Sequence, residues 1–104
     1  MDKKEHINNL KEFKKKLSKL ISINKMILFG SRAYGTPKEW SDFDLMIVST
    51  DFRKKVSFRR SLGFYKYWDL DYPVDFLCYT PEEFNKLKKQ ITIVKEAVKR
   101  GIEI

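Results

Sequence analysis

The chain has 104 residues, a length that fits one small domain (residues 1–104) with one modest core and excludes a second domain. Its 22 basic and 14 acidic residues give a net charge of +8. We attribute this charge to solvated helix faces rather than to attraction of a polyanion, because the lysines alternate with apolar residues at helical spacing. One cysteine and no long apolar stretch exclude an internal disulfide and a membrane span, so we expect a soluble, cytoplasmic protein.

The first predicted element is an amphipathic helix over about residues 3 to 22. Its apolar residues recur every three or four positions, with lysines between them, so one face packs on a sheet. His6, the only histidine, is expected on the exposed side of the helix start, without a role in a site. The apolar residues are Ile7, Leu10, Phe13, Leu17, Leu20 and Ile21.

A short buried strand is predicted at Lys25 to Phe29, because the apolar run KMILF ends abruptly at a glycine. Gly30 permits a sharp turn, and Ser31 follows where a short helix begins. The serine hydroxyl either caps that helix or binds an anion held against backbone N–H groups. Gly35 ends the helix after about one turn, and Thr36, Pro37 and a polar loop follow.

Two aspartates open the next predicted strand, Asp42 to Val48. Asp42 and Asp44 are two positions apart, so both carboxylates point to the same face of the sheet. They repel each other unless a cation lies between them, and hard oxygen ligands suit magnesium better than zinc. Magnesium in turn suggests a phosphate ligand, and we expect the turn at Gly30 and Ser31 to bind that phosphate.

Residues 51 to 68 are predicted as a helix that Asp51 caps and Gly63 weakens. The aromatic residues that end this stretch exceed what one helix buries against a small sheet, so they form either ordinary core or a partner surface. Asp69 and Asp71 are assigned to the turn before Pro73 rather than to a metal. The aromatic residues are Phe64, Tyr65, Tyr67 and Trp68.

A later strand, Pro73 to Cys78, carries Asp75 as the one charge in an apolar run. If buried, this carboxylate requires a metal, a hydrogen-bonding network or a raised pKa. Together with Asp42 and Asp44 it outlines a two-metal site for phosphoryl transfer. The chain then continues into a helix from Thr80 to Arg100, with a threonine cap and proline at its first position, and into a brief edge strand at residues 102–104.

These motifs resemble the signature of the minimal nucleotidyltransferases of the DNA polymerase β superfamily. The likeness rests on FGSRAYG (29–35), SDFDLMIV (41–48) and Asp75 on a later strand, and it extends over most of the chain. It implies an α/β (α+β) fold in which a small mixed sheet packs with helices. It also implies magnesium as cofactor in a two-metal site, ATP or another nucleoside triphosphate as substrate, and transfer of a nucleoside monophosphate.

By this resemblance the catalytic and metal-binding residues are Asp42, Asp44 and Asp75, and the nucleotide-binding residues are Gly30, Ser31, Arg32 and Ser41. Arg32 is either a solvent-facing helix residue or a cation near the phosphates. Ser41 orients the start of the strand or reaches the metal ligands.

Many small members of this family are antitoxins that act on a helical HEPN-domain toxin, and some adenylylate a tyrosine of that toxin. The resemblance therefore implies a HEPN-domain partner whose hydroxyl accepts AMP. Neutralisation of the partner by contact alone is the alternative. A small nucleic-acid binder ranks last, because the chain has no recognition helix or stacking platform.

Overall fold

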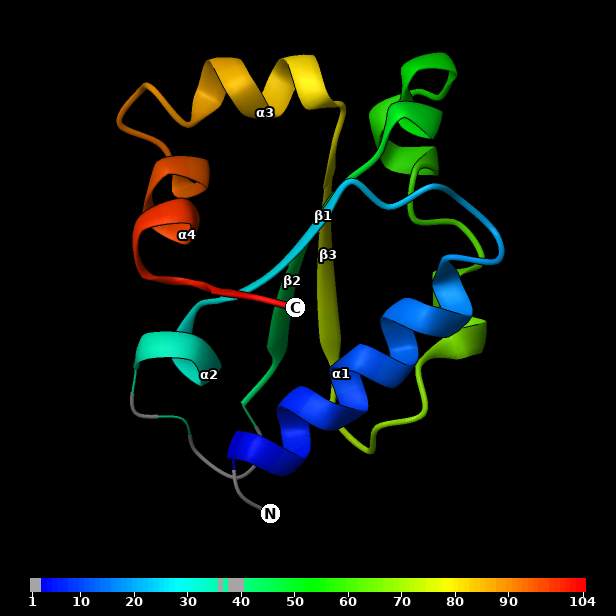
Figure 1. Ribbon diagram of the computed structural model, residues 1–104, viewed down its shortest axis with the longest axis vertical. Coiled ribbons are helices and arrows are strands. Elements are labelled where there is room, and N and C mark those ends of the chain that lie inside the picture. The colour runs from blue at the N-terminus through cyan, green and yellow to red at the C-terminus, as the bar shows by residue number, and fades with distance from the viewer. Residues whose placement is uncertain (1–2, 36, 38–40) are drawn as a thin grey trace.

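A four-stranded mixed sheet lies at the centre of the fold, with its strands in the order β3–β2–β1–β4 (Figure 1). This computed structural model describes residues 3–35, 37 and 41–104. β1 (Lys25–Phe29) is antiparallel to both β2 (Phe43–Val48) and β4 (Ile102–Glu103), and β2 is parallel to β3 (Val74–Tyr79). The predicted mixed sheet and its strands are confirmed. Most of the loop predicted at residues 36–41 lies outside the described residues.

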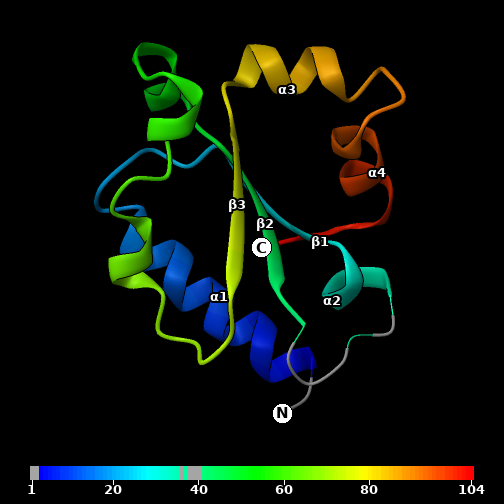
Figure 2. The same cartoon turned by 180° about the vertical axis from the view of Figure 1, so that it is seen from behind.

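Alternate residues of the strands pack into two cores, one on each face of the sheet. α1 (Lys3–Leu17) crosses one face, where it packs on Phe43, Leu45 and Ile47 (Figure 1). On the other face, Met46 and Val48 pack against α3 (Pro81–Leu87) and α4 (Ile93–Arg100). The reverse view has β2 and β3 in front of α1, with α2 (Ser31–Tyr34) beside the start of β2 (Figure 2).

The first helix is shorter than predicted and its histidine is buried. α1 ends at Leu17, because the amides of Lys19 and Leu20 bond three residues back and tighten the chain into a turn. His6 lies edge-on to the rings of Phe43 and Tyr72, so the expectation of an exposed histidine is wrong. An imidazole that follows the spacing of the apolar stripe packs with it when aromatic partners are present.

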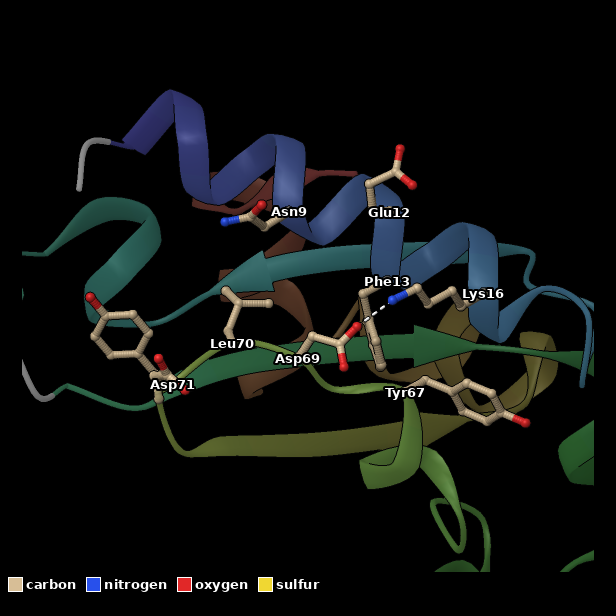
Figure 3. A pocket seen from close by; sticks show the side chains of 9 residues that line it. Asn9, Glu12, Phe13, Lys16, Tyr67, Asp69, Leu70 and Asp71 are labelled. Atoms are coloured by element: carbon tan, nitrogen blue, oxygen red, sulfur yellow. Dashed lines mark hydrogen bonds and ion pairs between the residues drawn. The ribbon is translucent and has the colours of Figure 1, made fainter.

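A pocket of about 380 Å³ separates α1 from the segment that leads into β3 (Figure 3). Phe13 and Leu70 supply apolar lining, and Lys16 forms an ion pair with Asp69 across it. Asp71 lines the same pocket. Neither aspartate belongs to the row of carboxylates that Asp42, Asp44 and Asp75 form.

Residues 51 to 68 do not form the predicted helix. Three short 3-10 helices occupy this region instead: η1 (Thr50–Lys54), η2 (Ser57–Arg59) and η3 (Phe64–Tyr67). Ser49, not Asp51, is the N-cap of η1, and Gly63 has a left-handed conformation with φ of 86°. That conformation interrupts any continuous helix. Of the aromatic residues, Phe64 is buried and Tyr65 is exposed, so the cluster divides between core and surface.

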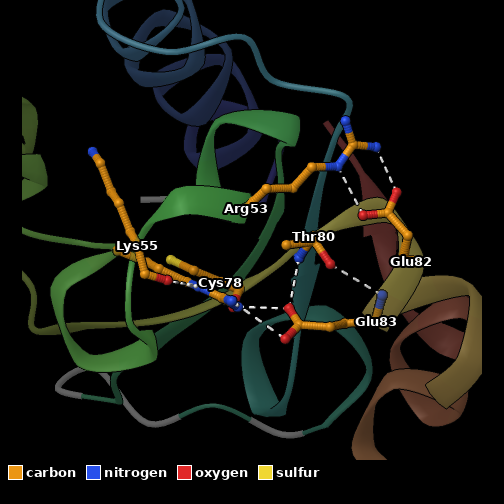
Figure 4. Close-up of polar contacts among 7 residues, drawn as sticks. Arg53, Lys55, Cys78, Thr80, Glu82 and Glu83 are labelled. Atoms are coloured by element: carbon orange, nitrogen blue, oxygen red, sulfur yellow. Dashed lines mark hydrogen bonds and ion pairs between the residues drawn. The ribbon is translucent and has the colours of Figure 1, made fainter.

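The predicted helix from Thr80 to Arg100 is two helices. The predicted capping box is confirmed, because Thr80 accepts from the amide of Glu83 and the Glu83 carboxylate accepts from the amide of Thr80 (Figure 4). Thr92 breaks the helix by capping α4, and its hydroxyl also donates to the carbonyl of Leu87. Ile91 lies in the turn between the helices and is 99% exposed.

Two side chains from the η region and its flanking turn cover the outer edge of β3. Tyr65 Oη donates to the carbonyl of Val74, and Arg60 donates to the carbonyl of Cys78. Arg60 is buried and also forms an ion pair with Glu83, at 2.6 Å. Outward carbonyls that are occupied in this way do not offer a template for a further strand.

Candidate functional site

Three strand ends bring the central residues of the site into one row. Phe29, the last residue of β1, is the register partner of Asp44 near the start of β2. Asp44 is in turn the register partner of Asp75 in the parallel strand β3. Side chains of register partners point to the same face, so the two carboxylates are neighbours on the face opposite α1. Figure 2 is viewed from that side.

Gly30 follows β1 directly and lies against the Asp44 side chain. Its φ of 75° and ψ of −161° place it in a region that only glycine adopts readily. A Cβ atom at this position would overlap Oδ2 of Asp44 and lie 3.1 Å from its Cγ. The turn therefore depends on glycine for its backbone conformation and for the close approach of a carboxylate.

Ser31 is the first residue of α2, and Gly30 is the N-cap. The helix has no side-chain cap, so Ser31 does not have the capping role that the sequence allowed. The amides of Ala33 and Tyr34 both bond to the carbonyl of Gly30, which closes the short helix onto the turn. Gly35 ends α2, as predicted.

Negative charge accumulates around Asp44. Partial burial raises the pKa of the Asp44 carboxyl, and the charges of Asp75 and Asp42 raise it further. Asp42 and Asp75 are exposed. Asp75 is therefore not buried and does not require the compensation that a buried carboxylate would, because β3 is an edge strand with its start open to solvent. A cation bound here would relieve the mutual repulsion of the carboxylates rather than compensate a buried Asp75.

The donor chemistry of this row fits a hard divalent cation. Carboxylate oxygens are the ligands that magnesium prefers, and their repulsion at Asp44 indicates a site of negative potential. Within residues 3–35, 37 and 41–104, no three acidic, histidine or cysteine side chains are gathered closely enough to hold a metal ion by themselves. Nucleotide phosphates or water would have to supply the remaining ligands, as is usual for magnesium.

Arg32 does not face solvent. Its side chain is buried, with the guanidinium carbon 4.5 Å from the ring centroids of both Phe43 and Tyr72. Its Nε donates to the carbonyl of Ser41 at 2.8 Å. The solvent-facing alternative for Arg32 is therefore wrong, and a role near the phosphates stays a prediction. The arginine ties α2 to the start of β2 from the α1 side of the sheet, because Phe43 packs in that core.

Two basic residues that the sequence analysis did not select contact α2. The Arg100 guanidinium lies 4.3 Å from the ring centroid of Tyr34 and forms an ion pair with Glu96. Lys3 Nζ donates to the carbonyl of Ala33. Each residue belongs to a lysine-rich amphipathic helix, and no local signal separates it from its solvated neighbours.

No helix in the described part of the chain is both long enough and apolar enough to span a membrane.

No curated relative matches the sequence significantly. The fold resembles the crystal structure of a candidate nucleotidyltransferase from Sulfolobus solfataricus, with a TM-score of 0.65 and 20% identity. That match covers 81% of this chain and 75% of the other. The sequence model of the nucleotidyltransferase domain matches residues 10–100, so the chain belongs to the nucleotidyltransferase domain family.

Proposed function

We propose that this protein transfers a nucleoside monophosphate, AMP from ATP, to a hydroxyl group of a HEPN-domain protein and thereby acts as its antitoxin in the cytoplasm. Membership of the nucleotidyltransferase domain family supports transfer as the reaction class. The observation that carries the assignment of the site is the row formed by Gly30, Asp44 and Asp75 across three strand ends.

In the proposed reaction, the acceptor hydroxyl oxygen attacks the α-phosphorus of ATP, and the bond from that phosphorus to the bridging oxygen of the leaving pyrophosphate breaks. Asp75 accepts the hydroxyl proton or helps to hold the metal. Asp42 and Asp44 would hold magnesium, which supplies charge stabilisation for the attacking and leaving oxygens. Gly30 and Ser31 would orient the triphosphate with backbone N–H groups.

Arg32 and Ser41 are assigned a positioning role. The bond from Arg32 Nε to the carbonyl of Ser41 fixes the residue that precedes Asp42. The rings of Phe43 and Tyr72, each with its centroid 4.5 Å from the guanidinium carbon, hold the guanidinium in place. Loss of Arg32 would therefore displace the aspartates relative to the turn, rather than remove a contact with phosphate.

A macromolecular acceptor is favoured by the exposure of Asp75. This carboxylate lies on the edge strand, with solvent access at the start of β3, so a hydroxyl on a large partner can approach it.

A contact-only antitoxin is the second candidate. The observation that favours it is the lack of a closed three-ligand metal group among the described residues. Both candidates are tested by incubating the chain with a HEPN-domain protein from the same genome, magnesium and ATP labelled at the α-phosphate. Label on the partner that depends on this chain supports transfer, whereas an unlabelled but inactivated partner supports contact alone.

A further inference from the structure

Three large apolar side chains are exposed within ten residues of the η region. Val56, Leu62 and Tyr65 are 56%, 66% and 58% exposed. Isolated exposed apolar residues are ordinary, but three in one short segment form a patch that soluble proteins use for binding. We call this surface, consisting of Val56, Arg59, Leu62 and Tyr65, the η ridge.

Backbone hydrogen bonds at a spacing of three residues connect Val56, Arg59 and Leu62 of the η ridge. The amide of Arg59 bonds to the carbonyl of Val56 at 2.9 Å, and the amide of Leu62 bonds to the carbonyl of Arg59 at 3.2 Å. Side chains three residues apart lie above one another in 3-10 geometry, so Arg59 and Leu62 share one side, whereas Val56 is the extended N-cap of η2. Tyr65 lies three residues further on, beyond the left-handed turn at Gly63 that interrupts this geometry.

The η ridge is surrounded by positive charge. Residues 53–67 contain six basic residues and no acidic residue. Two of the six, Arg53 and Arg60, form ion pairs with Glu82 and Glu83 of α3. The other four are exposed, so they give the surface of this segment a positive potential. They are Lys54, Lys55, Arg59 and Lys66.

One end of the η ridge lies against β3, the strand that carries Asp75, where it packs on the α1-side residue Phe76. Tyr65 Oη donates to the carbonyl of Val74, the residue immediately before Asp75, at 3.3 Å. The Tyr65 ring also packs on Phe76, the residue immediately after it, with centroids 5.1 Å apart. A molecule that covers Tyr65 therefore lies beside the strand that carries Asp75.

We propose that the η ridge is the docking surface for the acceptor protein, which presents apolar side chains bordered by carboxylates. This inference rests on the proposed function for the identity of the acceptor. Docking on the ridge would bring the acceptor hydroxyl to the exposed start of β3. Only one of the four ridge residues, Tyr65, is aromatic, which favours a protein over a nucleic acid, because nucleic-acid bases stack on aromatic platforms. A second copy of this chain would bring like charges together.

The test uses calorimetric titration of the HEPN-domain protein with wild-type chain, Leu62→Asp and Val56→Asp. Each substitution places a negative charge on the ridge at a position that is more than half exposed, so the fold should be retained. Ile91→Asp is the matched control, because Ile91 is also an exposed aliphatic residue but lies in the turn between α3 and α4. We expect each ridge variant to bind at least about 10-fold more weakly, with the control close to wild type.

The docking surface would be overturned if the wild-type chain did not bind the HEPN-domain protein, or if the ridge variants bound it as tightly as wild type does. It would also be overturned if the wild-type chain self-associated through the ridge, or if the ridge bound RNA instead. Sedimentation of the chain alone and an RNA-binding measurement separate the last two. If binding depends on the ridge but no label is transferred, the ridge is supported and the proposed transfer fails. If label is transferred equally by the ridge variants, the transfer is supported and the ridge fails.

Discussion

Gly30 and Asp44 approach each other so closely that a Cβ atom on Gly30 would overlap Oδ2 of Asp44. We therefore predict that Gly30→Ala loses nucleotide binding and destabilises the fold by about 2 kcal/mol or more. Alanine would have to adopt a backbone conformation that favours glycine, and its Cβ would clash with the Asp44 carboxylate. Urea denaturation followed by circular dichroism, together with calorimetric titration of ATP and magnesium, measures both effects.

Gly63→Ala is the control for Gly30→Ala. Gly63 also has a positive φ, of 86°, but among the described residues other than Gly63 and its two chain neighbours, no atom lies within 4 Å of the position that a Cβ would take there. This variant should be destabilised by about 1 kcal/mol from backbone strain alone and should bind ATP normally. A folded Gly30→Ala protein with wild-type ATP affinity would show that the turn does not hold the triphosphate.

Asp44→Asn should raise the Tm of the metal-free protein at pH 7. Burial and the charges of Asp75 and Asp42 raise the Asp44 pKa above its ordinary value of 3.8, so the folded state holds this proton more tightly than the unfolded chain. The resulting stabilisation is present below pH 3.8 and is lost as the pH rises through the raised value. At pH 7 the charged side chain therefore opposes folding. Thermal unfolding in EDTA should give a higher Tm for the variant than for wild type at pH 7, and this difference in Tm should disappear near pH 3.

Magnesium and ATP should reverse this difference. A ligand that binds only the folded state raises the Tm, and Asp44 is assigned to the metal. The wild-type Tm should rise on addition of magnesium and ATP, whereas that of Asp44→Asn should change much less. Equal shifts for the two proteins would remove Asp44 from the metal site.

Glu83→Gln tests the ion pair that joins α3 to the η region. Glutamine retains the capping box with Thr80, so the variant isolates the charge that faces buried Arg60 (Figure 4). We expect a loss of about 1 kcal/mol in urea denaturation at pH 7, since the half-exposed carboxylate is screened by solvent. The hydrogen bond from Arg60 lowers the Glu83 pKa, so this stabilisation should be lost as the pH falls below 4.5.

Glu82→Gln is the matched variant for that comparison. Its carboxylate pairs with Arg53 on the surface, at 2.5 Å, and both side chains are more than half exposed. An exposed pair contributes little, so the midpoint should stay close to that of wild type. If Glu82→Gln loses as much stability as Glu83→Gln, the burial of Arg60 is not the reason why its ion pair with Glu83 stabilises the fold.

The central motif was predictable because each part has a strong local signal. The run KMILF ends at a glycine, and the aspartates two positions apart open an apolar run, so both strands and the short helix between them were predicted correctly. The pairing of Asp44 with Asp75 was not derivable in the same way. It depends on the register of strands that are about thirty residues apart in sequence, which no local pattern specifies.

The errors arise where tertiary contacts override a local pattern. The apolar spacing of residues 80–100 suits one helix, but Thr92 bonds to both neighbouring segments and divides it. Arg32 and His6 look like surface residues in sequence, yet aromatic rings that are distant in the chain enclose them. Asp75 has the pattern of a buried charge, because sequence does not show that its strand is an edge.

Asp75→Asn provides the most direct test of the account. Asparagine keeps the shape of the side chain and removes its charge, so ATP and the HEPN-domain partner should bind much as in wild type. Transfer should fall about 100-fold or more, as is typical for loss of an acid-base group. The measurement is mass spectrometry of the partner after incubation with ATP and magnesium, which detects added nucleotidyl mass. A partner modified by wild type and left largely unmodified by Asp75→Asn is the predicted result; a partner that wild type and variant inactivate equally without modifying it would contradict the account.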